Sequence, residues 1–223
     1  MDEKKIIHCF GDSHVLFFKK LAKYLRLRQY KVKEKEVNIH FLADYVGSAL
    51  AYNLCKKNTS TKAREKIFDI IKKRVPVKNR VMFVFGEIDC RVHLAKRIIV
   101  KKENMKSVVL ECVDRYFSFI REVKNLNYEI LVFGAVATTI HEDTYFPKYG
   151  TCRERNKITK LFNQYLEDSC KKEDMIFVSI FDKLINKNNI TKWKFYCDNA
   201  HIGPKAFPLI IKEFEKKVED FIN

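Results

Sequence analysis

The stretch KKIIHCFGDSHVLFFKKL, residues 4–21, joins two elements of different kinds with almost no loop between them. Residues 6–10 are an apolar run of strand length, and an amphipathic, lysine-rich segment begins at residue 14. Ser13 therefore lies where a strand turns into a helix. At such a junction the serine side chain can be exposed, while the helix N-terminus offers backbone N–H groups and partial positive charge to a developing oxyanion.

Short apolar runs alternate with helix-length segments along the rest of the chain. The runs are near-continuous, as expected of strands buried on both faces, and they comprise residues 6–10, 37–42, 81–85, 130–136 and 176–181. The helical patterns cover residues 14–29, 48–57, 61–74, 106–124, 153–171 and about 204–221. This alternation predicts an α/β fold with about five parallel strands and right-handed crossovers.

The length and composition favour one globular domain over residues 1–223. A chain of 223 residues, 47% hydrophobic and 32% charged, with only four prolines and six glycines, can bury a full core. We find no internal repeat or linker. The first residues are too short for a signal peptide, and no window approaches the roughly 18 apolar residues of a membrane span.

The charge is strongly positive, with 44 basic against 28 acidic residues and a net charge of +16. Two interpretations remain open. The lysines can form an ordinary solvated surface of the kind that an AT-rich coding sequence produces, or they can form a face that attracts nucleic acid, an anionic glycan or a phosphorylated donor.

The seven cysteines are odd in number and include no C-x-x-C pair, so paired redox or metal spacings are missing. Several lie in apolar stretches, which favours reduced thiols and a cytoplasmic, reducing compartment. No histidine and carboxylate cluster has a metal-ligand spacing, and no glycine-rich phosphate loop is present. We therefore expect neither a metal nor a cofactor.

Polar residues collect after the predicted strands, where the reactive groups of open α/β sheets gather. A serine needs a base to take its proton, and that base is usually a histidine oriented by a carboxylate. Ser13 follows the first strand, and Asp198 and His201 lie three residues apart before the last helix. Each has a simpler explanation alone: Ser13 or Asp12 as a helix N-cap, His201 as an exposed loop histidine, and Asp198 as a turn cap.

Together these motifs resemble the SGNH (GDSL-type) hydrolase family across residues 11–201. The matching elements are Gly-Asp-Ser after the first strand, a glycine after the second, a G-x-x-D element after the third and D-x-x-H before the final helix. The resemblance implies a flavodoxin-like, three-layer α/β/α fold and metal-free chemistry. It implies Ser13 as nucleophile, His201 as general base and Asp198 as its orienting partner. The backbone N–H groups of Ser13 and Gly47 would form the oxyanion hole.

The third block departs from the family pattern, which has an asparagine before the aspartate to donate a hydrogen bond to the oxyanion. Here the block is Gly86-Glu87-Ile88-Asp89, and isoleucine cannot donate. Arg91 and His93 are the nearest replacements, and Arg91 can alternatively bind an anionic part of the substrate. A structural ion-pair cluster of Glu87, Asp89 and Arg91 is equally compatible with the sequence. His14 is a weaker base candidate than His201, because no carboxylate stands at a suitable offset.

Two further groups of residues can line a substrate pocket. Thr138, Thr139 and His141 follow the fourth strand, although threonines are common there. The aromatic and basic residues of the next stretch can grip a sugar ring and an acidic group, or can anchor their own loop: Tyr145, Phe146, Lys148, Tyr149, Arg153 and Arg155.

The sequence thus favours a serine esterase or acyl-group transferase. Its substrates would be small acyl esters, most plausibly O-acetyl groups on carbohydrate, with an anionic substrate or donor as a further option. Two alternatives remain: a basic protein that binds nucleic acid or another anionic polymer, and a hydrolase-like scaffold that the Ile88 change has made inactive.

Overall fold

A five-stranded parallel sheet forms the centre of the computed structural model, which describes residues 5–28, 31–32, 35–36, 39–141 and 146–218. Its strands are β1 (Lys5–Gly11), β4 (Ile39–Tyr45), β5 (Arg80–Val84), β6 (Glu129–Phe133) and β7 (Ile176–Val178), in the spatial order β4-β1-β5-β6-β7. By sequence this is the order 2-1-3-4-5 of flavodoxin-like sheets. Two-residue strands β2 (Lys31–Val32) and β3 (Lys35–Glu36) form a separate antiparallel pair.

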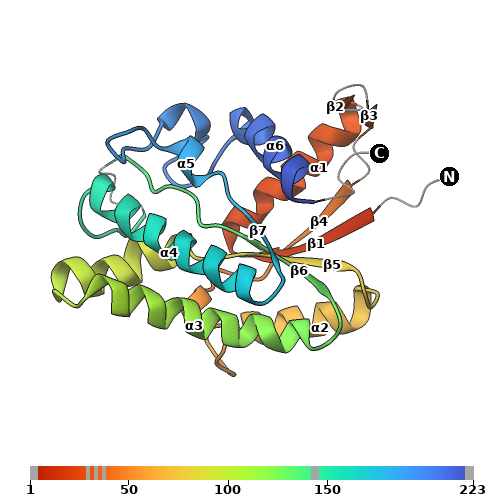
Figure 1. Cartoon of the computed structure of the whole chain (residues 1–223), viewed down its shortest axis with the longest axis horizontal. Helices are drawn as coiled ribbons and strands as arrows, with labels where there is room; N and C mark the ends of the chain where they lie inside the picture. The colour runs from red at the N-terminus through yellow and green to blue at the C-terminus, as the bar shows by residue number, and fades with distance from the viewer. Residues whose placement is uncertain (1–4, 29–30, 33–34, 37–38, 142–145, 219–223) are drawn as a thin grey trace.

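Helices cover both faces of the sheet (Figure 1). One face carries α1 (Leu16–Arg28), α5 (Phe181–Leu184) and α6 (Phe207–Lys217). The other carries α2 (Ala63–Arg74), α3 (Met105–Lys124) and α4 (Cys152–Lys172). The predicted three-layer α/β/α architecture is confirmed. No helix in the described part of the chain is both long and apolar enough to cross a membrane.

Strand β1 lies between β4 and β5 and is buried on both faces, which explains its continuous apolar pattern. Ile7 and Cys9 point into the core beneath α1 and α6, where the Phe18 ring lies 5.0 Å from that of Phe133. Phe10 points to the opposite core, beneath α2, α3 and α4. Side chains alternate along a strand, so β1 contributes to both cores, and residues 11–14 follow it at the carboxyl edge of the sheet.

Several predicted boundaries shift in the structure. The segment 48–57 contains only the 3₁₀ turn Ala51–Asn53, since the backbone N–H groups of Ala51 and Tyr52 donate to the Asp89 carboxylate instead of extending a helix. The run 176–181 ends as a strand at Val178, because α5 begins at Phe181. The first two residues of the predicted strand 37–42 and the end of the predicted helix 204–221 lie outside the described residues.

The segment after β5 is the least expected element. It forms π-helical turns over Asp89–Leu94 and Lys96–Val100, a rare conformation that is often found at functional sites. Gly86 starts the segment with φ at +112°, and a Cβ there would lie 2.4 Å from Cε1 of Phe162. Only glycine fits this turn, which directs the next residues toward the end of β1.

Candidate active site

Ser13, His201 and Asp198 form a continuous hydrogen-bonded chain at the carboxyl edge of the sheet. Ser13 opens the 3₁₀ turn Ser13–Val15 between β1 and α1, and His201 lies in the loop before α6. His201 Nε2 is 2.8 Å from Ser13 Oγ, across 188 positions of sequence. His201 Nδ1 is 2.9 Å from both carboxylate oxygens of Asp198. The fold therefore brings together the three residues that the sequence singled out.

Asp12, rather than Ser13, caps the turn. Its Oδ1 accepts a hydrogen bond of 2.9 Å from the backbone N–H of His14, as an N-cap residue does. The Ser13 hydroxyl is consequently free to bond the imidazole of His201. The sequence left open whether Ser13 or Asp12 is the N-cap residue, and the structure assigns the cap to Asp12.

The loop that carries Asp198 keeps its carboxylate ionised and fixed. Asp198 Oδ1 accepts backbone hydrogen bonds from Ala200 at 2.8 Å and from His201 at 2.7 Å. Partial burial alone would raise the pKa of Asp198, but these bonds and the bond from the His201 ring lower it below its usual value. The aspartate therefore stays an acceptor that orients Nδ1 of His201.

His201 has the protonation state that a general base needs. Burial lowers the pKa of His201, and the neighbouring His14 lowers it further, whereas Asp198 opposes both effects. With a lowered pKa, the ring is neutral at neutral pH. If Nδ1 carries the hydrogen and donates it to Asp198, then Nε2 presents a lone pair to the Ser13 hydroxyl.

Gly47 lies beside this chain, because the backbone N–H of Val46 donates to the carbonyl of Gly11 at 3.1 Å. Gly47 has φ at +109°, a conformation that favours glycine. A Cβ there would meet nothing closer than 3.7 Å, so the backbone conformation, not space, requires the glycine. The turn after β4 is thus held next to the start of the Ser13 turn.

Glu87 and Arg91 form a buried ion pair. Arg91 Nε is 2.7 Å from Glu87 Oε1, and Nη2 is 3.1 Å from Oε2. Arg91 Nη1 also donates to the carbonyl of Pro147, and the two side chains are only 5% and 4% exposed. Of the three roles that the sequence allowed for Arg91, this geometry fits the structural ion pair better than the replacement donor or a contact to an anionic substrate.

Asp89 is separate from that pair. Its fully buried carboxylate accepts hydrogen bonds of 2.8 Å from the backbone of Ala51 and 3.1 Å from that of Tyr52. It therefore ties the third block to the segment that follows Gly47. His93 is exposed and lines a different pocket with Lys96 and neighbouring residues, so the structure does not bring it to Ser13.

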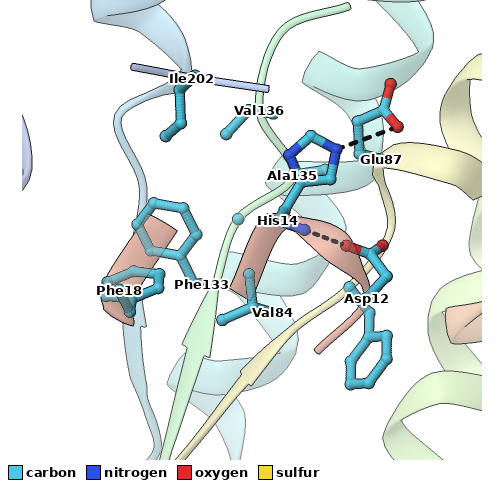
Figure 2. A pocket seen from close by; sticks show the side chains of 11 residues that line it. Asp12, His14, Phe18, Val84, Glu87, Phe133, Ala135, Val136 and Ile202 are labelled. Carbon is cyan, nitrogen blue, oxygen red and sulfur yellow. Dashed lines mark hydrogen bonds and ion pairs between the residues drawn. The ribbon is translucent and has the colours of Figure 1, made fainter. Parts of the chain in front are cut away.

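His14 has a carboxylate partner in the fold, although no carboxylate stands at a suitable offset from it in the sequence. Figure 2 shows its ring directed at Glu87, and Nε2 lies 3.3 Å from Glu87 Oε2. The partner comes from a position 73 residues away, beyond the reach of any local spacing rule. Sequence reasoning missed this contact. One signal could have indicated it: His14 and Glu87 each follow a predicted strand, and both strands end at the same edge of the sheet.

Thr138 faces the protein interior instead of a pocket. It is 2% exposed, its Oγ1 accepts from Arg155 Nε at 3.1 Å, and its backbone N–H donates to Asn156. Arg155 is fully buried and also donates to the carbonyls of Thr139 and Gly150. Arg155 therefore anchors the loop after β6, which is the alternative role considered for it. His141 is partly buried, with its ring 4.1 Å from that of Trp193.

The aromatic residues of that loop divide between two places. The Phe146 ring lies 6.1 Å from the His201 ring and beneath the Arg91 guanidinium, so it borders the site. Tyr149 packs against Lys96 instead. Tyr145 lies outside the described residues.

A cleft of about 250 Å³ opens beside the hydrogen-bonded chain. Its walls are formed by Ser13, His14, Leu16, Phe17, Lys20, Asp198, His201 and Ile202. The cleft is mainly apolar, with Lys20 contributing a positive charge. Within the described residues, no group of three histidine, cysteine, aspartate or glutamate side chains is arranged to hold a metal ion.

Asp12 gives the site a testable dependence on pH. Complete burial raises the pKa of Asp12 to about 6, although the hydrogen bond and charge of His14 oppose the increase. A carboxyl with a raised folded pKa stabilises the fold only while it is protonated. As pH rises from about 4 to about 6, the contribution of Asp12 to the free energy of unfolding should therefore fall by on the order of 3 kcal/mol.

The Asp12→Asn variant isolates this effect, because asparagine keeps the capping oxygen and removes the titration. Urea unfolding at pH 4, 5, 6 and 7 should show the variant gaining stability relative to the wild type as pH rises. The difference should level off above pH 7. A wild-type-to-variant difference that stays constant from pH 4 to pH 7 would contradict a raised pKa at Asp12.

Comparisons with known proteins match this chain by structure alone. No family model and no curated protein matches the sequence. A GDSL-like lipase from Bacteroides thetaiotaomicron superposes with a TM-score of 0.61 at 10% identity, over 99% of this chain and 90% of that one. An acetylxylan esterase from Geobacillus stearothermophilus, solved as a catalytic mutant, gives 0.58 at 12% identity, over 97% and 94%. A further acetyl xylan esterase gives 0.56 at 11% identity, over 95% and 98%. The chain has the fold of the GDSL-type, or SGNH, hydrolases.

Proposed function

We propose that this protein is a serine esterase or acyl-group transferase that acts through Ser13, His201 and Asp198. The observation that carries the proposal is the unbroken chain from Ser13 Oγ through both nitrogens of His201 to the Asp198 carboxylate, with distances of 2.8 and 2.9 Å. Such a chain activates a serine for attack on an ester carbonyl. The chain lies at the carboxyl edge of a sheet whose fold matches that of ester hydrolases.

In the first half of the reaction, Ser13 Oγ attacks the carbonyl carbon while His201 Nε2 takes the hydroxyl proton. The backbone N–H groups of Ser13 and Gly47 donate to the oxygen that becomes negative. When the tetrahedral intermediate collapses, the ester C–O bond breaks and His201 returns the proton to the leaving oxygen. The acyl group is then attached to Ser13 Oγ as an ester.

In the second half, water or a hydroxyl group of an acceptor attacks that ester, and His201 again takes and returns the proton. Water yields the free acid, and a sugar hydroxyl yields the transferred ester. Because Ile88 cannot donate and Arg91 is paired with Glu87, the oxyanion hole rests on backbone donors. Losing one donor costs about 10²-fold to 10³-fold in rate, so we expect modest turnover.

We propose small acyl groups, above all O-acetyl groups on carbohydrate, as the substrates. The cleft beside Ser13 has a volume of about 250 Å³, which suits a small acyl ester, and two of the matched folds belong to proteins named as acetyl xylan esterases. Lys20 at the cleft can attract an anionic substrate or donor. The fold comparisons offer no support for nucleic acid as a partner.

Acetate release from p-nitrophenyl acetate and from an O-acetylated xylan oligosaccharide tests this proposal, with and without unacetylated sugar acceptors. An esterase should release acetate in both cases. A transferase should divert acetyl groups to the added sugar. Mass spectrometry detects this as a gain of about 42 Da on the acceptor, since one acetyl group replaces one hydrogen. Absence of acetate release and of transfer from folded protein, at a level indistinguishable from Ser13→Ala, would contradict the proposal.

A further inference from the structure

A second histidine packs directly against His201. The ring of His14 lies 4.9 Å from the ring of His201, centroid to centroid, at an interplanar angle of 42°. His14 is 7% exposed, directly follows Ser13 in sequence and lines the same cleft as Ser13 and His201. The Ser-His-Asp chain does not use this residue.

The orientation of the His14 ring is fixed from one side by charge. Nε2 lies 3.3 Å from Glu87 Oε2, and the same carboxylate is held by two nitrogens of Arg91. Hydrogen bonds and charges of His14 and Arg91 overcome the effect of burial and lower the pKa of Glu87 to about 2. The carboxylate is thus ionised throughout the useful pH range, and it can only accept a hydrogen from Nε2.

The other side of the ring is apolar. Figure 2 shows the ring of His14 between Glu87 and the side chains of Ala135, Val136 and Ile202, which border a cavity of about 10 Å³. Nδ1 of His14 has no hydrogen-bond partner among the described protein groups. The cavity has room for about one water molecule. Besides Glu87, the cavity wall includes the carboxylate of Asp12, which accepts a hydrogen bond from the backbone N–H of His14.

We propose that His14 is a positioning residue of this site: held by Glu87 and Arg91, it is the charged member of a histidine pair and keeps His201 neutral and in place for Ser13. The charged and titratable groups around the pair are Asp12, Glu87, Arg91 and Asp198, together with Lys20 on the wall of the cleft. The inference rests on the proposed function for its catalytic meaning, whereas the coupling between the two rings is measurable without a substrate.

The surroundings of His14 and His201 shift the pKa values of the two rings in opposite directions. Burial alone would lower the pKa of His14, but the hydrogen bond to Glu87 and the charges of Asp12 and Glu87 raise it above the usual value. Burial lowers the pKa of His201, and the charge of His14 lowers it further. Two cationic rings this close repel each other, so the first proton goes to His14 and opposes a second on His201. His201 consequently remains a base at lower pH than an isolated histidine would.

Titration of the imidazole Cε1–H signals by NMR from pH 4 to pH 9 tests the pairing. The His14 and His201 signals are assigned with His14→Gln and His201→Gln, and His40→Gln serves as the matched control. His40 lies on β4 opposite Ile6, toward the other end of the sheet. In the wild type, His14 should titrate at a higher pH than His201. In His14→Gln, which keeps an amide near Glu87 without the charge, the His201 midpoint should rise by about one pH unit.

The pH profile of labelling by a fluorophosphonate probe supplies the catalytic readout. Its acid limb should move to higher pH in His14→Gln by the same amount as the His201 midpoint, which a merely structural role would not produce. An unchanged His201 midpoint in a folded His14→Gln protein overturns the proposal. So does a wild-type titration in which His14 is the later of the two to gain a proton, a result that stands even if the variant fails to fold. A raised midpoint without any probe labelling would support the coupling and reject the esterase instead.

Discussion

Ester hydrolysis should fall by about 10⁴-fold or more when Ser13 is replaced by alanine, and by a similar amount when His201 is replaced by alanine. Ser13 supplies the attacking oxygen, and among the residues that the structure describes His201 is the only group within hydrogen-bond distance of that oxygen, at 2.8 Å, that can take its proton. The measurement is kcat/KM for p-nitrophenyl acetate, corrected for hydrolysis in buffer.

Two features make this test specific. Ser118→Ala, on the exposed face of α3, is the matched serine control and should retain wild-type activity. The double variant Ser13→Ala/His201→Ala should be no slower than either single variant, because the two residues act as a unit. Activity within a few-fold of the wild type in Ser13→Ala, or losses that multiply in the double variant, would contradict the proposed chemistry.

Glu87→Ala should lower the free energy of unfolding by about 3–5 kcal/mol, the usual cost of breaking a buried ion pair from one side. The substitution leaves Arg91 and His14 buried without the carboxylate that both contact. Asp69→Ala is the control, since its 2.8 Å ion pair with Lys73 is on the surface and should contribute less than about 1 kcal/mol. Urea unfolding at pH 7 compares the two variants.

The sign of the pH dependence provides a second check on Glu87. Its pKa is lowered to about 2 in the folded protein, so its ionised form stabilises the fold above about pH 4.5, and this contribution is lost as pH falls from there toward 2. The difference in stability between the wild type and Glu87→Gln should therefore shrink below pH 4.5. A cost of Glu87→Ala no larger than that of Asp69→Ala would show that the buried cluster does not stabilise the fold.

The sequence predicts the architecture and the three residues of the hydrogen-bonded chain, because both follow from local pattern. Strand-length apolar runs locate the sheet, and polar residues directly after those runs lie at its carboxyl edge. Ser13 and His201 meet because the first strand lies inside the sheet and the last helix packs into the same core as that strand. Asp198 needs only its three-residue offset to reach Nδ1 of His201.

What the sequence cannot predict depends on contacts between distant segments. The Asp89 carboxylate accepts hydrogen bonds from two backbone N–H groups of the segment 48–57, and the predicted helix does not form there. Arg155 looks like a pocket residue by its position, yet its guanidinium meets loop carbonyls and is fully buried. Glu87 and His14 meet only after two separate strands have been placed side by side. Propensity and spacing describe none of these contacts.

The most direct test of the account is the intact mass of the protein after exposure to a fluorophosphonate serine probe. The wild type should gain a single adduct, Ser13→Ala should gain none, and His201→Ala should react at least a hundredfold more slowly, in line with the usual contribution of a general base, roughly 10²-fold to 10⁴-fold. Folded wild-type protein that gains no adduct, or an adduct that persists in Ser13→Ala, would contradict the claim that His201 activates Ser13.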